Sequence, residues 1–218
     1  MRRLPGFLVA VTAVFGGGIA CSQSPAGPSA ADLPGSGSLS TIVDVPITVD
    51  VTEGLVGTWN YVGQSVTIPS GASVGNVRFA WYHYNPRGET TAFGRIYVLD
   101  REYLGLPGDL SPSTPGYLSR SEPEASGMSN AQGSEYTLPP GLTLAGNTRY
   151  WFYTDTKGAF ANSFDKDIYA GGSMWHTGYY LLAFYPSKAS GRMVNGVFVP
   201  APPGVTIDAN FRLRGTAK

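Results

Sequence analysis

The stretch NVRFAWYHY (Asn76–Tyr84) alternates apolar and polar side chains with a period of two residues. Val77, Phe79 and Trp81 would lie on one face of an extended chain, because successive side chains of a β-strand point to opposite faces. His83 continues that face at the end of the stretch. The stretch therefore predicts a β-strand with one buried face.

The same kind of pattern recurs along the chain, separated by turn signals rich in Gly, Pro and Asn. The further candidate strands are TIVDVPITVDV (41–51), TAFGRIYVLD (91–100), TRYWFYTD (148–155), YYLLAFY (179–185) and DANFRLRG (208–215). Pro46 favours an edge position for the first of them. No stretch has an apolar stripe at helical spacing over three turns. We therefore expect an all-β fold, an antiparallel two-sheet jelly-roll sandwich of about ten strands, with almost no helix outside the N-terminal signal segment.

The first twenty residues have the features of an export signal. Arg2 and Arg3 precede the short apolar run LPGFLVAVTAVF (4–15), which GGGIAC (16–21) follows. This segment resembles the lipobox of bacterial lipoproteins, with Gly18 in place of the usual Leu. The resemblance implies that Cys21, the single Cys of the chain, is lipidated and becomes the first mature residue. The alternative is a secretory signal with a Cys near its cleavage site by chance.

Composition divides the chain into residues 1–20 (signal peptide), 21–40 (a flexible Ser/Pro/Gly/Ala tether) and 41–218 (the sandwich domain). Of the 15 basic side chains, Arg2 and Arg3 lie in the signal, which leaves 13 against 15 acidic ones. This balance gives no excess of positive charge that would bind nucleic acid or an anionic membrane. We therefore expect the protein to attach to the membrane through the N-terminal lipid. The sequence after Cys21 lacks the Asp that marks retention at the inner membrane. We therefore expect an exported protein, anchored at the outer membrane or cell surface.

The polar, Pro-rich segment Gly105–Asn130 departs from the strand pattern. A structureless insertion of this length is uncommon in a compact domain. We expect a short strand around Tyr117–Ser119 flanked by loops, which serve as surface decoration or as a binding loop.

Several stretches in the same order resemble the choice-of-anchor R family of secreted bacterial β-sandwich domains. They are QSVTIPSGASVGNVRFAW (64–81), RIYVLD (95–100), GLPGDL (105–110), YTLPPGLTLAGNTRYWFYTD (136–155), YAGG (169–172) and DANFRLRG (208–215). The resemblance spans about Gln64 to Arg214, and LTLAGNTRYWF (Leu142–Phe152) is its most specific part. It implies a sandwich fold and a surface anchor, and it brings no catalytic residues.

Three residues are candidates for catalysis. Ser73 lies in GASVG (Gly71–Gly75), but a nucleophile elbow needs a helix after the Ser, whereas a predicted strand follows here. His83 shares the apolar face of its strand, which favours a hydrogen-bonded histidine at the core edge. His176 lies in YAGGSMWHTG (Tyr169–Gly178), which is typical of a tight turn and also compatible with a ligand-contacting edge. We expect no catalytic residue, no metal and no cofactor, since the metal-ligand spacings are missing.

The strongest hypothesis for a binding patch combines aromatic and acidic side chains at one end of the sandwich. Its members are Trp175, His176, Tyr179, Asp165 and Asp167. Exposed Trp and Tyr rings stack on sugar rings, whose hydroxyl groups bind to nearby acids. Most aromatic residues of such a domain instead fill its core. The same acids, with Asp155, are also possible Ca²⁺ ligands, although acids in a polar loop are usually just solvated.

These observations predict a lipid-anchored, non-enzymatic cell-envelope domain that acts in adhesion, surface structure or glycan binding. Its partners would be the membrane, reached through the lipid, and a polysaccharide or an envelope protein. One alternative is a subunit of an envelope assembly, which would pair through the exposed edge of the Val43–Val51 strand. The other is a glycan- or ester-active hydrolase on the same scaffold. Glycosidases need two carboxylates, for which the free candidates are Glu89, Glu102, Glu122, Glu124 and Glu135.

Overall fold

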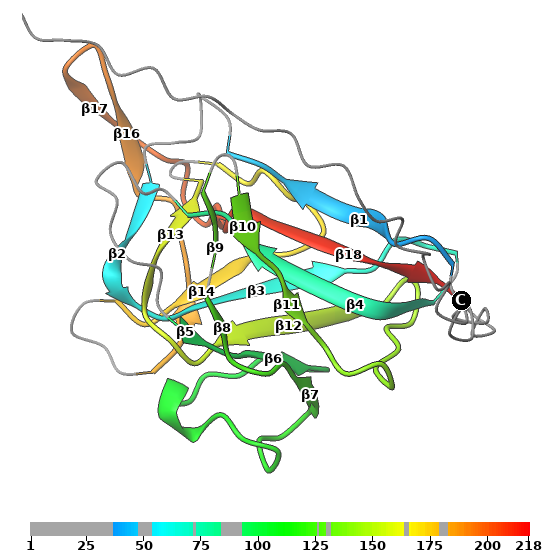
Figure 1. Ribbon diagram of the computed structural model, residues 1–218. Coiled ribbons are helices and arrows are strands. Elements are labelled where there is room, and N and C mark those ends of the chain that lie inside the picture. The colour runs from blue at the N-terminus through cyan, green and yellow to red at the C-terminus, as the bar shows by residue number, and fades with distance from the viewer. Residues whose placement is uncertain are drawn as a thin grey trace, which may run out of the picture. The chain divides into compact units, whose positions relative to one another are not determined.

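Strands in which apolar and polar residues alternate pair into two large antiparallel sheets, as the sequence predicts (Figure 1). The computed structural model describes residues 37–47, 54–71, 73–83, 93–125, 127–129, 132–163, 166–178 and 183–218. Within these ranges the regular structure consists of β-strands and one turn of 3-10 helix, η1 (Pro107–Asp109). The all-β class is confirmed.

The larger elements form a four-stranded and a six-stranded sheet. In spatial order, the four-stranded sheet contains β1 (Ser40–Val45), β18 (Phe211–Ala217), β4 (Val74–Trp81) and β11 (Tyr136–Thr137). The six-stranded sheet contains β15 (Tyr185–Pro186), β14 (Met174–His176), β3 (Val62–Thr67), β12 (Arg149–Thr154), β6 (Ile96–Leu99) and β7 (Tyr117–Arg120). The expected number of about ten strands matches these two sheets.

The remaining strands of the described ranges form two-stranded sheets. The pairs are β2 (Gly54–Asn60) with β13 (Gly158–Asn162), β5 (Phe93–Gly94) with β8 (Glu124–Ala125), β9 (Gly127–Ser129) with β10 (Gln132–Ser134), and β16 (Gly191–Val194) with β17 (Val197–Pro200). Strand β1 lies at an edge, as Pro46 suggests, and residues 48–51 of the predicted first strand lie outside the described ranges. The jelly-roll strand order stays a prediction.

The core lies between the two sheets. Val77, Phe79 and Trp81 of β4 are fully buried there, as the alternation predicts. Phe79 stacks on Phe152 of β12 with 4.6 Å between the ring centroids, and so joins the two sheets. Burying a side chain of this size stabilises the fold by about 1.5–3 kcal/mol. Residues Gly37–Lys218 form one compact unit around this core.

The outer face of the six-stranded sheet carries a second apolar cluster. It contains Tyr97, Leu99, Leu110, Tyr153, Trp175 and Phe184. Tyr153 is fully buried, and its hydroxyl oxygen accepts a hydrogen bond from the Tyr103 amide (3.0 Å). Residues 100–120, which we call the covering segment, contribute Tyr103 and Leu110 to this cluster. The predicted short strand within this segment is confirmed as β7, and the loops beside it cover the sheet.

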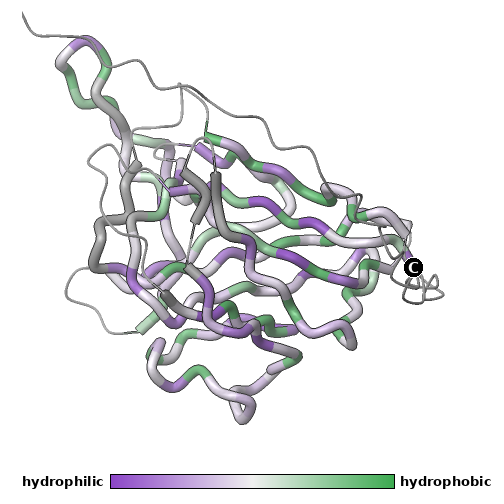
Figure 2. The backbone as a smooth tube through the Cα atoms, in the orientation of Figure 1, coloured by the Kyte–Doolittle hydropathy of each residue, from purple (hydrophilic) through white to green (hydrophobic). Residues whose placement is uncertain are grey.

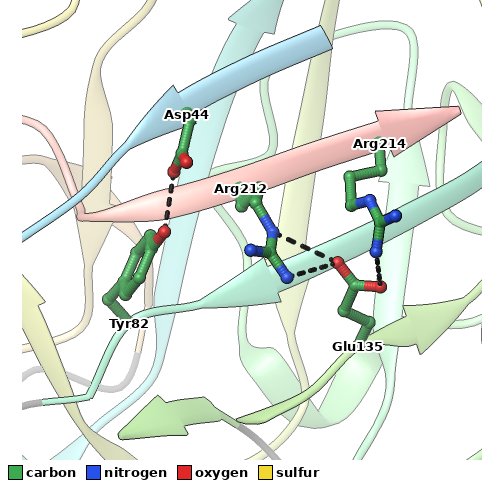
Figure 3. Close-up of polar contacts among 5 residues, drawn as sticks. All are labelled: Asp44, Tyr82, Glu135, Arg212 and Arg214. Carbon is green, nitrogen blue, oxygen red and sulfur yellow. Dashed lines mark hydrogen bonds and ion pairs between the residues drawn. The ribbon is translucent and has the colours of Figure 1, made fainter. Parts of the chain in front are cut away.

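The outer face of the four-stranded sheet is polar instead (Figure 3). The Glu135 carboxylate accepts hydrogen bonds from Arg212 Nη2 (3.0 Å) and Arg214 Nη1 (3.1 Å), both on β18. Beside them the Tyr82 hydroxyl donates to Asp44 on β1 (2.7 Å). Arg212 and Arg214 point outward because Phe211 and Leu213 alternate with them and fill the core.

Candidate functional site

Strand β14 carries two of the predicted binding residues, Trp175 and His176, and lies between β3 and β15. Only 6% of Trp175 is exposed. Its indole Nε1–H donates to Glu102 Oε1 (2.8 Å), and its ring packs edge to face against Trp151. Little of the ring is therefore free to stack on a sugar, since the covering segment occupies that position.

Two side-chain contacts hold His176 at the same edge of the sheet. Its Nδ1 atom shares a short hydrogen bond with Ser187 Oγ, and its ring packs against Tyr185 with 4.4 Å between the centroids. Burial lowers the pKa of His176, so the imidazole is neutral at pH 7. A Ser–His contact also occurs in hydrolases, but Ser187 is fully buried and has no surface for a substrate. The pair acts as a structural link in the fold described here.

The other members of the predicted patch do not join these two in the described structure. Tyr179 and Asp165 lie outside the described residues. Asp167 is exposed, and its Oδ1 accepts a hydrogen bond from the Tyr169 amide (3.0 Å). Asp155 likewise accepts from the Arg95 amide (2.7 Å). In the described parts of the chain, no three His, Cys, Asp or Glu side chains gather closely enough to hold a metal ion.

A buried carboxylate that was not predicted, Asp208, accepts several hydrogen bonds near the same part of the sheet. Asp208 accepts hydrogen bonds from Gln64 Nε2 (2.9 Å) and from the amides of Ile168 (3.1 Å) and Tyr169 (3.0 Å). Gln64 Oε1 in turn accepts from the Ala209 amide (2.9 Å). Burial raises the pKa of Asp208 to about 7, despite these three donors. The sequence gives no clear signal for this link, because Gln64 and Asp208 lie in stretches that contain other polar residues.

The surroundings of the other two catalytic candidates, His83 and Ser73, also differ from those of a catalytic site. His83 is buried against Phe160 with 4.9 Å between the centroids, and burial lowers its pKa to about 4. Among the residues that the structure describes, His83 Nε2 has no hydrogen-bond partner, and the predicted hydrogen bond of this histidine stays a prediction. Ser73 is followed by strand β4, and therefore lacks the helix of a nucleophile elbow.

The acids named for a hydrolase lie apart. Glu102 binds Trp175 on the outer side of the six-stranded sheet, whereas Glu135 binds two arginines on the outer side of the other sheet. Glu122 and Glu124 are exposed, and Glu89 lies outside the described residues.

A projecting hairpin is the clearest surface feature and was not predicted. Among the strands that the structure describes, β16 and β17 pair only with each other, and they stand away from the two sheets (Figure 1). Asn195 and Gly196 both have positive φ angles (49° and 78°), which is the geometry of a type I′ turn. Val197 and Phe198 are 66% and 54% exposed, and apolar residues line the hairpin (Figure 2). The sequence signal was VNGV (194–197), an Asn-Gly pair between apolar residues.

The hairpin exposes more apolar surface than an isolated side chain would. A strand packed on a protein body buries alternate residues, whereas all four residues of β17 are exposed. Neither face of this strand is therefore covered by the described residues. Exposed apolar groups that gather in this way mark interaction sites.

Comparisons with known proteins give no match, either among protein families or among curated proteins. In the described part of the chain, no helix is long and apolar enough to cross a membrane.

Proposed function

We propose that this chain is an exported, lipid-anchored, non-enzymatic domain of the bacterial cell envelope, which acts in adhesion or surface structure through its β16–β17 hairpin. The carrying observation is the exposure of successive apolar residues on both faces of β17. Contact with another protein would bury these groups and also supply hydrogen-bond partners for the open hairpin edges.

A protein-directed role fits the hairpin better than glycan binding does. Sugar recognition needs an exposed aromatic ring with polar groups beside it. Trp175 is covered, and the hairpin tip carries Val197 and Val199 beside Phe198. Two sets of contacts support the non-enzymatic role, because they engage candidate catalytic groups within the fold. His176 is hydrogen-bonded to the buried Ser187, and Glu135 forms ion pairs with Arg212 and Arg214.

The anchor is tested by acyl labelling of the full chain in its host. We expect Cys21 to incorporate a fatty-acid probe and Cys21→Ser to lose both the label and the membrane attachment. Labelling that persists in Cys21→Ser would contradict the proposed anchor.

The binding element is tested by a photo-crosslinking amino acid in the full-length protein on cells. We expect crosslinks to an envelope protein when it replaces Phe198. The matched control replaces Thr137, an exposed residue of β11 on the polar face of the sandwich. Equal yields at the two positions would remove the hairpin as the binding element.

A further inference from the structure

Large exposed apolar side chains occur in only two segments of the described chain. One segment is the hairpin and the other is the covering segment. The exposed residues are Val194, Val197, Phe198 and Val199 in the first, and Leu104, Leu106 and Leu118 in the second. Each segment thus presents apolar groups that nothing in the described chain buries.

The two segments lie on different sides of the sandwich. In Figure 1 the hairpin projects beyond the upper end of the sheets, while η1 and β7 of the covering segment lie along the lower side. One copy of the chain therefore cannot bring its own hairpin onto its own covering segment. Contact between the two segments requires two copies.

Their charges are complementary. Residues 187–206, which contain the hairpin and its base, include Lys188 and Arg192 and no acid. The covering segment, residues 100–120, contains three acids (Asp100, Glu102 and Asp109) against two arginines (Arg101 and Arg120), and two further acids, Glu122 and Glu124, follow it directly. Opposite charges around apolar contacts favour this pairing, whereas pairing of two hairpins would bring like charges together.

We propose that copies of this chain associate head to tail, with the hairpin of one copy docked on the covering segment of the next. This inference rests on the proposed function, because the lipid anchor would hold many copies on one surface and raise their effective concentration. A contact between two different surfaces of one protein is heterologous, and it extends into rows or rings of copies. The partner of the hairpin is then the protein itself.

Engineered cysteines test the contact in the full-length protein on cells, because Cys21 is the only natural Cys. One tagged copy carries Val197→Cys, Phe198→Cys or Val199→Cys, and a second, differently tagged copy carries Leu104→Cys, Leu106→Cys or Leu118→Cys. Disulfides form only where Cα atoms approach within about 7 Å. We expect at least one of the nine mixed pairs to give a disulfide dimer about tenfold above both the matching single-cysteine dimers and the unmodified chain.

A charge reversal provides the second readout on the best mixed pair. Lys188→Glu is expected to lower the yield of the mixed dimer about fivefold, since it places an acid against the acidic covering segment. The matched control is Lys166→Glu, which reverses an exposed charge on a different loop. Thermal unfolding of each variant confirms that the fold is kept. Equal yields for the two reversals would overturn the charge-guided contact.

The outcomes separate this inference from the proposed function. Dimers through Phe198→Cys alone would show that hairpins pair symmetrically, which overturns the head-to-tail arrangement. Failure of all nine pairs, with photo-crosslinks from position 198 to a different envelope protein, overturns the self-association and leaves the proposed function standing. Failure of both kinds of crosslink overturns both.

Discussion

The outer faces of the two sheets differ although their strands alternate in the same way. On the six-stranded sheet, Tyr153 points outward from β12 and is fully buried beneath the covering segment. On the four-stranded sheet, Arg212 and Arg214 point outward from β18 and stay in contact with solvent around Glu135. The comparison shows that the alternation within a strand determines which residues share a face. Whether solvent reaches that face depends on a Pro- and Gly-rich segment elsewhere in the chain, the covering segment.

Removing the aromatic ring from the covered face should have the largest effect on stability. Tyr153→Ala is expected to cost about 3–5 kcal/mol, as much as Phe152→Ala in the core, because both rings are fully buried. Urea unfolding of the two variants measures this. The control is Thr137→Ala on the exposed outer face of the other sheet, expected within about 0.5 kcal/mol of the wild type. A small loss for Tyr153→Ala would mean that the outer face of the six-stranded sheet is not dry.

The edge of the six-stranded sheet tolerates no side chain at Gly172. A Cβ there would overlap the backbone carbonyl oxygen of Ser65 on β3. Gly172→Ala should therefore force the strands apart and cost about 1–3 kcal/mol in thermal or urea unfolding. Gly141→Ala provides the control, because a Cβ at Gly141 meets no other atom within 4 Å. Equal stability of the two variants would contradict the close approach of Gly172 to β3.

The buried carboxyl group of Asp208 and the buried imidazole of His83 should change the folding stability in opposite directions with pH. The raised pKa of Asp208 (about 7) makes stability fall as pH rises from about 4 to 7, by up to about 1.4 kcal/mol per pH unit. The lowered pKa of His83 (about 4) makes stability fall as pH drops from about 6.5 to 4, and burial of His176 acts in the same direction.

The two effects offset each other in the wild type between pH 4 and 6.5. Relative to the wild type, Asp208→Asn should therefore lose more stability on acidification in this range, whereas His83→Phe should lose less, because only His176 then opposes Asp208. Urea unfolding at a series of pH values measures both slopes. Parallel slopes in the two variants would show that these groups do not titrate as their burial requires.

The polar face should give the smallest effect. Glu135→Gln weakens the ion pairs with Arg212 and Arg214, which are partly exposed, and is expected to cost about 1 kcal/mol. The loss should shrink at high salt, because salt screens the pairs in the wild type. Asp44→Asn provides a comparison on the same face. Burial and the hydrogen bond to Asp44 raise the pKa of Tyr82 to about 12. A loss for Glu135→Gln as large as that of Tyr153→Ala would erase the distinction between the faces.

The sequence predicts the strands better than the surfaces that they form. Alternation in β4 and β18 correctly places Phe79, Phe211 and Leu213 in the core, since period-two patterns report local geometry. The burial of Trp175 could not be predicted, because its neighbours in the apolar cluster are distant in the chain, and Glu102, which accepts its indole hydrogen bond, lies 73 residues away. The Asp208 network also joins residues distant in sequence. Such contacts follow from tertiary packing, which a single sequence does not reveal, and the family resemblance and the lipid anchor stay predictions.

The base of the hairpin has a consequence for how the domain can change. Lys188 and Thr206 face each other across a β-bridge, and the Ala189 amide donates to the Val205 carbonyl (2.9 Å). The chain thus leaves the sandwich and re-enters it at adjoining points. The tip between them can be shortened, exchanged or replaced by a foreign peptide without rerouting any other strand. The strand order of the sandwich is therefore independent of the length and sequence of this tip.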